Sequence, residues 1–338
     1  MCIRDRDGIT NGAIYALLAL SILLVFTVTR VLFIPQGEFV AFGALTMAAI
    51  QAGKPVLLVW LLLAFALAEA AADLVARAKR PGRARGLWRI AAKAIYPLVL
   101  AALFYRLPLA QLPMSVQALL TLLLVVPMGP QLYRLFYQPI ASASTLVLLI
   151  VSIAVHLALV GLGLLAFGAE GARTAPFSDA SLALGPININ SQALWVVAVS
   201  AVLIIVLYQF FERSMYGKAL RAAAFNRLGA RLMGISPIFA GRATFFLAAL
   251  IGTVSGILIA PITTMYFDSG FMVSLKGFVG AIIGGLVSYP LAAAGAILVG
   301  LIEAFSSFWA SAYKEIIVFT LIIPVLLWRS LKSHHVEE

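Results

Sequence analysis

The ionisable side chains inside the apolar runs of this sequence are its first candidates for chemistry. They are few: Glu69, Asp73, His156, Lys276 and Glu303, with Glu38 at the edge of a run. An ionisable group at membrane depth costs about 2.5–3.5 kcal/mol on insertion scales, so each of them requires a partner, a cavity or a function. Lys276 and Glu303 have opposite charges in consecutive runs, which favours either a structural ion pair or the lining of a solute conduit.

Three of these side chains have plainer interpretations. Glu69 and Asp73 are four residues apart on one face of a helix, where they can offset the basic loop that follows. His156 stands alone between Val155 and Leu157, a setting more typical of a buried hydrogen-bonding residue than of a ligand.

Known catalytic and metal-binding patterns are missing from the sequence. Its single cysteine, Cys2, cannot form an internal disulfide, and there is no GxxxxGK[ST] phosphate loop, HExxH, GxSxG or Cys/His cluster. We therefore expect a chain that is not an enzyme, with no catalytic residue, no metal site and no cofactor of its own. Energy from ATP would have to come through another chain.

The composition is that of a membrane protein. Hydrophobic residues make up 63% of the 338 positions and charged residues 11%, whereas soluble domains have roughly 45–50% and about 25%. The net charge of +11 comes from Lys and Arg that gather in short loops between apolar runs, as the positive-inside rule describes. This distribution favours membrane topology over nucleic acid as the explanation of the charge.

Helices long enough to cross a bilayer must position these residues. The apolar runs cover residues 9–29, 39–50, 56–74, 95–107, 116–128, 145–167, 193–211, 239–262, 272–286, 291–309 and 316–328. They predict an all-α fold, a single polytopic transmembrane helical bundle over residues 1–338 with about eight to eleven membrane segments. The nearly neutral segment 168–192 is expected on the outer side, and Arg329 and Lys332 indicate an inner C-terminus.

Two of the membrane segments are interrupted. Residues 36–40 (Gln-Gly-Glu-Phe-Val) and 275–279 (Leu-Lys-Gly-Phe-Val) each belong to a short glycine-bearing stretch with a charge near its start. Paired broken or re-entrant segments in two halves indicate a translocation site and an inverted pseudo-repeat, because freed backbone groups at membrane depth must line a cavity or be buried in protein. A chance match in a chain rich in Gly and Val is the alternative.

A charged, amphipathic segment, residues 212–237, separates two long apolar runs. Its five cations stand against a single acid, Glu212; they are Arg213, Lys218, Arg221, Arg227 and Arg231. Leu220, Ala224, Leu228 and Leu232 recur every four residues, which places them along one side of a short helix that could dock on a cytoplasmic partner. The alternative is that the positive charge only fixes topology.

Several stretches carry a resemblance to one family. They are Asn11-Gly12-Ala13-Ile14-Tyr15, Gln36-Gly37-Glu38, Tyr216-Gly217-Lys218-Ala219-Leu220-Arg221-Ala222, Ala230-Arg231-Leu232-Met233-Gly234-Ile235, Leu275-Lys276-Gly277-Phe278 and Gly300-Leu301-Ile302-Glu303-Ala304. As an ordered set, they make the sequence resemble the permeases of branched-chain amino-acid ABC importers, the H-type membrane subunit of the Liv system.

The resemblance implies an importer subunit in the bacterial inner (plasma) membrane. Its cargo would be branched-chain or related small amino acids or amides, and ATP would be used by two separate cytoplasmic ATPase subunits. The other partners would be a second permease subunit, a periplasmic or lipid-anchored substrate-binding protein and membrane lipid, with no nucleic acid. Residues 212–237 would be the cytoplasmic coupling loop that meets the ATPases.

Two sets of site residues follow from this interpretation. The candidates for ATPase coupling are Tyr216, Gly217, Lys218, Arg221, Arg227, Arg231 and Gly234. The candidates for the substrate pathway are Asn11, Tyr15, Gln36, Glu38, Lys276 and Glu303.

The chain departs from the family pattern in two places that matter for function. Residues 33–37 are Phe-Ile-Pro-Gln-Gly where Asn-Phe-Ala-His-Gly is usual, and Phe225-Asn226 stands where the coupling loop usually has an acidic pair. An ion-coupled secondary transporter of a small solute is the alternative function, and it would use a buried group such as Glu303 to bind the coupling ion. A membrane scaffold that transports nothing is a third, which the two interrupted segments disfavour.

Overall fold

Helices form along nearly every apolar run of the sequence. The computed structural model describes residues 2–79, 87–178, 181–184, 187–286 and 288–333. Its long helices are α1 (Cys2–Thr29), α3 (Leu58–Lys79), α4 (Leu87–Arg106), α7 (Thr145–Phe167), α8 (Ser191–Arg213), α11 (Pro237–Ile259) and α13 (Tyr289–Trp309). The shorter ones are α2 (Gln36–Gln51), α5 (Met114–Val125), α6 (Met128–Leu132), α9 (Met215–Phe225), α10 (Arg227–Leu232), α12 (Ser269–Ile283), α14 (Lys314–Thr320) and α15 (Ile322–Ser333). Single turns η1 (Leu109–Gln111), η2 (Tyr133–Tyr137), η3 (Gln138–Ile140) and η4 (Ser311–Tyr313) complete the helical structure.

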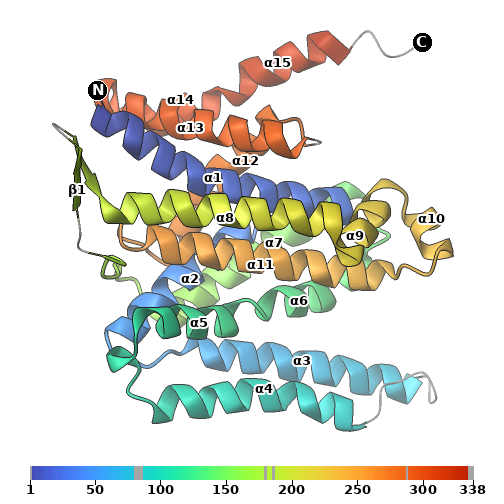
Figure 1. Ribbon diagram of the computed structural model, residues 1–338. Helices are drawn as coiled ribbons and strands as arrows, with labels where there is room; N and C mark the ends of the chain where they lie inside the picture. The colour runs from blue at the N-terminus through green and yellow to red at the C-terminus, as the bar shows by residue number, and fades with distance from the viewer. Residues whose placement is uncertain (1, 80–86, 179–180, 185–186, 287, 334–338) are drawn as a thin grey trace.

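The predicted polytopic helical bundle is confirmed. Within the described residues, seven helical stretches are long and apolar enough to cross a membrane, and α12 is a shorter apolar helix. One small element was not predicted: strands β1 (Ser181–Leu184) and β2 (Ile187–Asn190) form an antiparallel hairpin. The hairpin leads directly into the start of α8 (Figure 1).

Five prolines in the middle of the chain, at positions 97, 108, 113, 127 and 130, predict breaks in its helices. Pro108, Pro113 and Pro127 immediately precede η1, α5 and α6, where a missing backbone N–H costs little. Pro97 lies inside α4, which continues through it as an uninterrupted helix. The prediction of a break was therefore wrong at Pro97 and at Pro130, which lies inside α6, and right at the other three.

α1 lies in the core of the bundle and α8 at its edge. Of the apolar window in α1, 83% is buried, whereas in α8 the buried share is 11%. α1 packs against α8, α11, α12 and α13. The apolar side chains that α8 exposes are the kind that lipid tails cover in a membrane protein. α8 therefore faces lipid or another membrane subunit. α1 is the helix around which α8, α11, α12 and α13 pack.

The two ends of the bundle carry different segments. We call the end with α9 and α10 the inner end, and the end with the N-terminus and the β1–β2 hairpin the outer end; they lie at the right and left of Figure 1. The last turn of α3 and the first turn of α4, which flank the other basic loop, also lie at the inner end. The helix turns that flank that loop therefore lie at the same end as α9 and α10, as the positive-inside pattern predicts.

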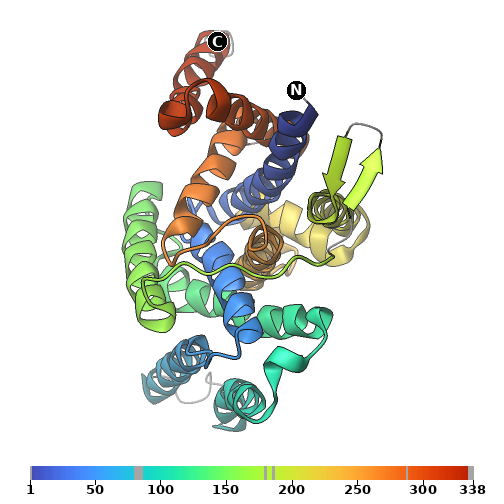
Figure 2. The same cartoon turned by 90° about the vertical axis from the view of Figure 1, so that its left-hand side faces the viewer.

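The two short helices α2 and α12 meet inside the bundle, with their first turns in contact. Gly37 and Gly270 lie backbone to backbone, and a Cβ built on Gly37 would fall 2.5 Å from the carbonyl oxygen of Gly270. Almost every residue of α2 is buried, and both helices lie in the middle of the molecule (Figure 2). The two segments that the sequence marks as interrupted thus contact each other at the starts of their helices.

Each short helix follows a long helix, and the two pairs are arranged as an inverted repeat. α1 runs from the outer to the inner end and α11 in the opposite direction (Figure 1). α2 packs against α11, and α12 packs against α1. Gly37 and Gly270 hold equivalent places in this arrangement, because each lies in the first turn of its short helix.

Candidate functional site

Residues 212–237 fold as two short helices at the inner end, and side chains of the sequence define both of them. Ser214 caps α9 by accepting a hydrogen bond from the Gly217 N–H at 2.9 Å, and Asn226 caps α10 by accepting one from the Gly229 N–H at 2.9 Å. Serine and asparagine are among the best residues for this position. Asn226 has extended backbone angles, φ −145° and ψ 100°, so it ends one helix and begins the next.

This break overturns the predicted docking face. Leu220 is 1% exposed and packs with α1, whereas Leu228 and Leu232 are 70% and 81% exposed. The four leucine and alanine positions therefore do not share one face, because their spacing holds only within an unbroken helix. Phe225, Leu228, Leu232 and Met233, at the end of α9 and along α10, are exposed, and we call them the inner patch; Phe225 is 96% exposed and Met233 82%.

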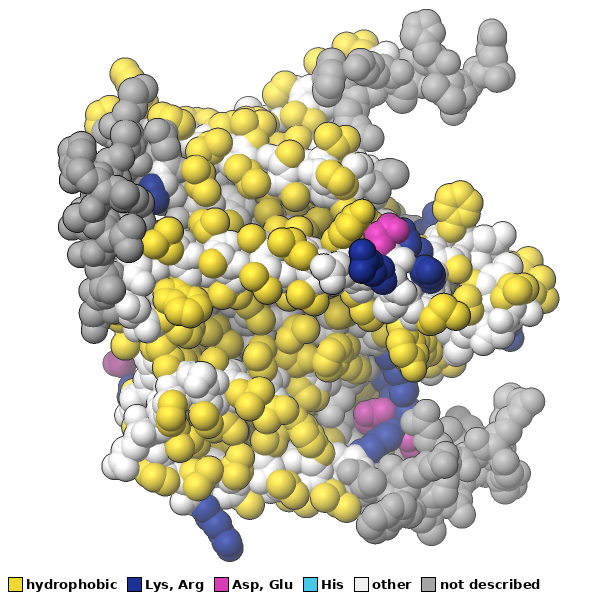
Figure 3. Space-filling view, in the orientation of Figure 1, with side chains coloured by type: hydrophobic (Ala, Val, Ile, Leu, Met, Phe, Trp, Pro, Cys, Tyr) yellow, Lys and Arg dark blue, Asp and Glu magenta, His cyan; other side chains and the backbone are white. Residues whose placement is uncertain are grey.

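The predicted coupling cations surround this segment. Lys218, Arg221 and Arg231 are exposed, and the Arg221 guanidinium donates to the Glu212 carboxylate at 2.6 Å. Figure 3 shows charged side chains at this end of the molecule, beside a flank that is otherwise mostly hydrophobic. The side chain of Arg227 lies outside the described part of the chain. The segment that carries the inner patch thus also exposes positive charge.

The other predicted coupling residues hold the shape of the segment. A Cβ at Gly217 would overlap the carbonyl oxygen of Phe210, so only glycine lets α9 fold back closely on α8. Gly234 has φ +81°, a left-handed conformation that glycine adopts at little cost and that commonly ends a helix. The ring of Tyr216 lies 5.8 Å from that of Phe239 at the start of α11.

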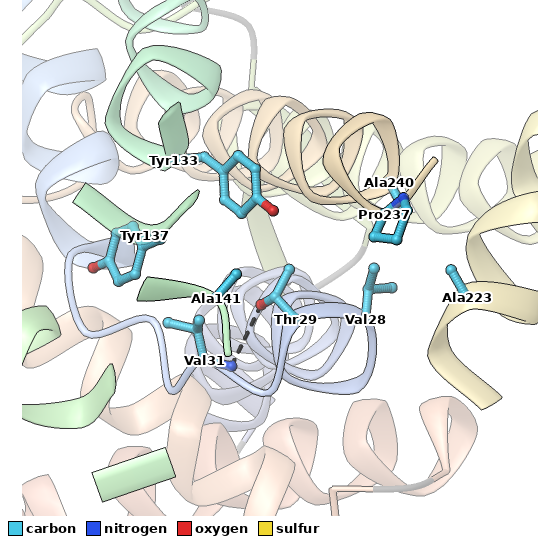
Figure 4. Close-up of a pocket in the computed structure, with 9 residues that line it drawn as sticks. All are labelled: Val28, Thr29, Val31, Tyr133, Tyr137, Ala141, Ala223, Pro237 and Ala240. Carbon is cyan, nitrogen blue, oxygen red and sulfur yellow. Dashed lines mark hydrogen bonds between the residues drawn. The ribbon is translucent and has the colours of Figure 1, made fainter. Parts of the chain in front are cut away.

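α9 is packed against the helices that form the core. Leu220 and Ala223 of α9 form one buried cluster with Leu24 and Val28 of α1 and Ala240 of α11. A cavity of about 50 Å³ adjoins this cluster. Figure 4 shows Ala223 and Pro237 on one side of it and Tyr133 and Tyr137 on the other, with Val28 and Thr29 between them. A displacement of α9 would therefore reach α1 and α11 directly.

Three of the predicted pathway residues form one buried polar group between α1, α12 and α13. The Lys276 ammonium donates to Glu303 Oε1 at 2.5 Å, and the Tyr15 hydroxyl donates to Glu303 Oε2 at 2.5 Å. Lys276 and Glu303 are each 7% exposed and Tyr15 is 4% exposed. The predicted ion pair is present, and both carboxylate oxygens of Glu303 have a partner. We call these residues the buried triad.

The remaining pathway candidates lie elsewhere. Glu38, in the first turn of α2, bonds to His156 Nδ1 of α7 at 2.7 Å, and the His156 ring lies 4.7 Å from that of Phe271 in the first turn of α12. Gln36 donates from Nε2 to the carbonyl oxygen of Ala248 at 3.0 Å. His156 is thus a hydrogen-bonding residue, as predicted. Asn11 lines a separate cavity at the outer end, so the six candidates fall into three groups.

Glu69 and Asp73 have specific partners on other elements. The Lys93 ammonium lies 2.6 Å from Glu69 and 2.7 Å from Asp73, and Arg134 binds both carboxylates. Arg242 of α11 lies 3.8 Å from Glu69. These acids therefore connect α3 to α4, η2 and α11, which goes beyond offsetting the basic loop. Sequence spacing gave no signal for Arg134 or Arg242, because both come from distant parts of the chain.

Comparison with known proteins places the chain in a family. A model of the branched-chain amino acid transport system permease component matches residues 86–326, which is more than half of the chain. The permease LivH of the high-affinity branched-chain amino acid transport system of Escherichia coli K12 is 29% identical over 210 residues, covering 59% of this chain and 67% of LivH. LivH of Salmonella typhimurium LT2 gives the same figures.

A third relative is similar over the same extent. BraD of Pseudomonas aeruginosa, described as a permease of a high-affinity branched-chain amino acid transport system, is 26% identical over 208 residues, covering 60% of this chain and 68% of BraD. No solved structure matches the chain.

Proposed function

The chain belongs to the family of branched-chain amino acid transport permeases, and we propose that it is the membrane-spanning permease subunit of an ABC importer that moves branched-chain or related small amino acids or amides into the cytoplasm. It is a multi-pass membrane protein and a transport subunit rather than an enzyme. ATP would be bound and used by two separate cytoplasmic ATPase subunits, since the sequence has no phosphate-binding loop of its own.

The inner patch carries this proposal. Phe225, Leu228, Leu232 and Met233 expose apolar surface at the end of the molecule where the basic segments lie. Because that end faces water, such side chains indicate an interface with another protein. The surrounding Lys218, Arg221 and Arg231 would complement acidic residues on the partner and orient it. A cytoplasmic ATPase subunit is the partner that fits a permease at this end.

Movement of the ATPases would reach the core through α9. Closure of two ATPase subunits would press on α9 and α10, and the cluster around Leu220, Ala223 and Val28 would pass the displacement to α1 and α11. These are the two long helices on which α12 and α2 pack. A rocking of one half against the other would then open a path alternately to each side of the membrane.

The substrate pathway remains a proposal built on three groups of residues. Lys276, Glu303 and Tyr15 would respond to movement of α12 against α1 and α13, and Gln36 and Glu38 to movement of α2. Asn11 would act at the outer end. A second permease subunit, a periplasmic or lipid-anchored substrate-binding protein and the bacterial inner membrane complete the assembly that we propose.

The alternative, an ion-coupled secondary transporter, has less support. Its coupling ion would require an accessible carboxylate, and both oxygens of Glu303 are engaged by Lys276 and Tyr15.

Charges placed in the inner patch should separate the ATPase from this chain. We expect Leu228→Asp combined with Leu232→Asp to weaken the complex about 100-fold or more, because the contact would bury carboxylates without partners. The measurement is co-purification of the tagged chain with the ATPases encoded by its neighbouring genes, followed by leucine transport in proteoliposomes.

A matched variant is Tyr266→Asp, which places an acid on an exposed aromatic at the outer end and should leave the ATPase bound. Retention of the ATPase by the double variant would remove the inner patch from the interface. If no ATPase binds either form and the chain alone moves solute along an ion gradient, the importer proposal is wrong.

A further inference from the structure

The outer end holds a polar cavity, of whose lining the transport proposal above uses only Asn11. Its volume is about 450 Å³, within the range of small-molecule sites. Polar side chains from three parts of the chain line it: Asp7 and Asn11 from α1, Arg173 from the segment before the hairpin, and Asn190 and Gln192 around the start of α8. We call it the outer cavity. The other cavities described above or lying along the flank are mainly apolar.

Arg173 is held in a fixed position at this cavity. Its Nε donates to the carbonyl oxygen of Pro261 at 2.8 Å and its Nη2 to that of Ile262 at 2.9 Å. These two carbonyls belong to the connection between α11 and α12. Two hydrogen bonds fix the plane of the guanidinium while its charge remains, because backbone carbonyls are neutral partners. Such a group is suited to bind a carboxylate.

The charge of the cavity favours an anionic group with a polar neighbour. Arg6 and Asp7 also line it, and their side chains lie 3.3 Å apart, so they offset each other and Arg173 supplies the net positive charge. The α8 N-terminus adds partial positive charge at the same wall. Asn11 brings an amide oxygen that can accept from an ammonium, whereas the Asn190 oxygen already accepts from the Gln192 N–H at 3.1 Å. One wall can thus hold an anion and another a cation.

We propose that the outer cavity is a reception subsite for a small zwitterion, an α-amino acid whose carboxylate pairs with Arg173 and whose ammonium meets the amide of Asn11. This rests on the proposed transport function and adds the place where cargo first contacts the chain. Arg173 is bonded to the connection that leads to Ser269, the first residue of α12. Occupancy of the cavity is therefore linked by direct contacts to the helix whose first turn touches that of α2.

Equilibrium binding of radiolabelled leucine to the full chain in lipid nanodiscs tests the proposal without any ATPase. We expect Arg173→Gln to weaken leucine binding about tenfold or more, because it removes a charged hydrogen bond to the carboxylate. Arg173→Lys should retain part of the affinity. Arg106→Gln, which removes a positive charge at the end of α4, should leave the affinity unchanged.

Two analogues resolve the orientation of the zwitterion. Leucinamide lacks the carboxylate, so any binding of it should be insensitive to Arg173→Gln, whereas 4-methylpentanoate lacks the ammonium and should be insensitive to Asn11→Leu. Thermal unfolding of each variant checks that the protein still folds. If Arg173→Gln does not fold, Asn11→Leu still tests the proposal.

The subsite is overturned if wild-type chain binds no leucine, or if Arg173→Gln and Asn11→Leu both bind it as wild type does. It is also overturned if leucine binds only when a substrate-binding protein is docked, since the carboxylate at Arg173 would then come from that protein. None of these results depends on the capture of an ATPase, so failure of the subsite is distinct from failure of the transport proposal.

Discussion

Lys276→Met alone should destabilise the protein by about 3–5 kcal/mol, because it leaves the Glu303 carboxylate buried without its cation. The triple variant Tyr15→Phe, Lys276→Met and Glu303→Met should recover most of that loss. All three residues are buried and bond only to one another in the contacts described, and replacing a complete buried polar group by apolar residues of similar size is often neutral or stabilising. Reversible unfolding of the detergent-solubilised chain measures both.

Transport by the triple variant then decides the role of the buried triad. If Tyr15, Lys276 and Glu303 act in the substrate pathway, the triple variant will fold and yet move leucine poorly in the complete complex. A variant that folds and transports at the wild-type rate would show that the triad only joins α1, α12 and α13. If Lys276→Met is as stable as wild type, the ion pair itself is not formed in the protein.

Gly270→Ala should be among the most damaging single substitutions in the chain. The added Cβ would overlap the carbonyl oxygen of Gly37, and a Cβ at Gly37 would in turn press on the backbone of Gly270. Backbone atoms in the middle of the bundle cannot rotate away as a side chain can, so α2 and α12 would have to separate. We expect a loss of about 1–3 kcal/mol or more from overpacking, together with loss of transport.

Gly161→Ala is the matched control for this substitution. Gly161 lies inside α7, and a Cβ built there meets nothing within 4 Å. Alanine is a better helix residue than glycine by roughly 0.5–1 kcal/mol, so this variant should be neutral or slightly more stable. Thermal unfolding and leucine transport are compared for both variants. Equal behaviour of the two would mean that α2 and α12 do not touch at Gly37 and Gly270.

The sequence was enough to single out two glycine-bearing segments, although it did not show that they meet or through which residues. The similarity of 36–40 to 275–279 falls in the middle of α12, whose first residue is Ser269. A local signal marks that start: the Ser269 hydroxyl accepts from the Tyr266 N–H at 3.1 Å, and Asp268 occupies the cap position. Short polar residues before glycine favour such a turn, and this chemistry locates the helix better than the repeated letters do.

The inner patch shows why periodicity misled in residues 212–237. A repeat of four predicts one face only if the helix is continuous, and Asn226 is a residue type that favours the N-cap of a new helix. Other contacts had no signal in the sequence. Arg134 and Arg242 reach Glu69 only because η2, α3 and α11 pack together, and such long-range contacts depend on the tertiary fold.

α2 packs on α11, and α12 packs on α1. This exchange of partners between the two halves also constrains how the chain is made. α2 is near the N-terminus and leaves the ribosome early. Its main partner α11, and Gly270 that contacts Gly37, are synthesised only after about two thirds of the chain. Until then its buried face, including Gln36 and Glu38, lacks the helices that cover it. Completion of the core must therefore wait until synthesis is nearly finished. Truncation after α10 should leave a polypeptide that the cell's membrane proteases remove.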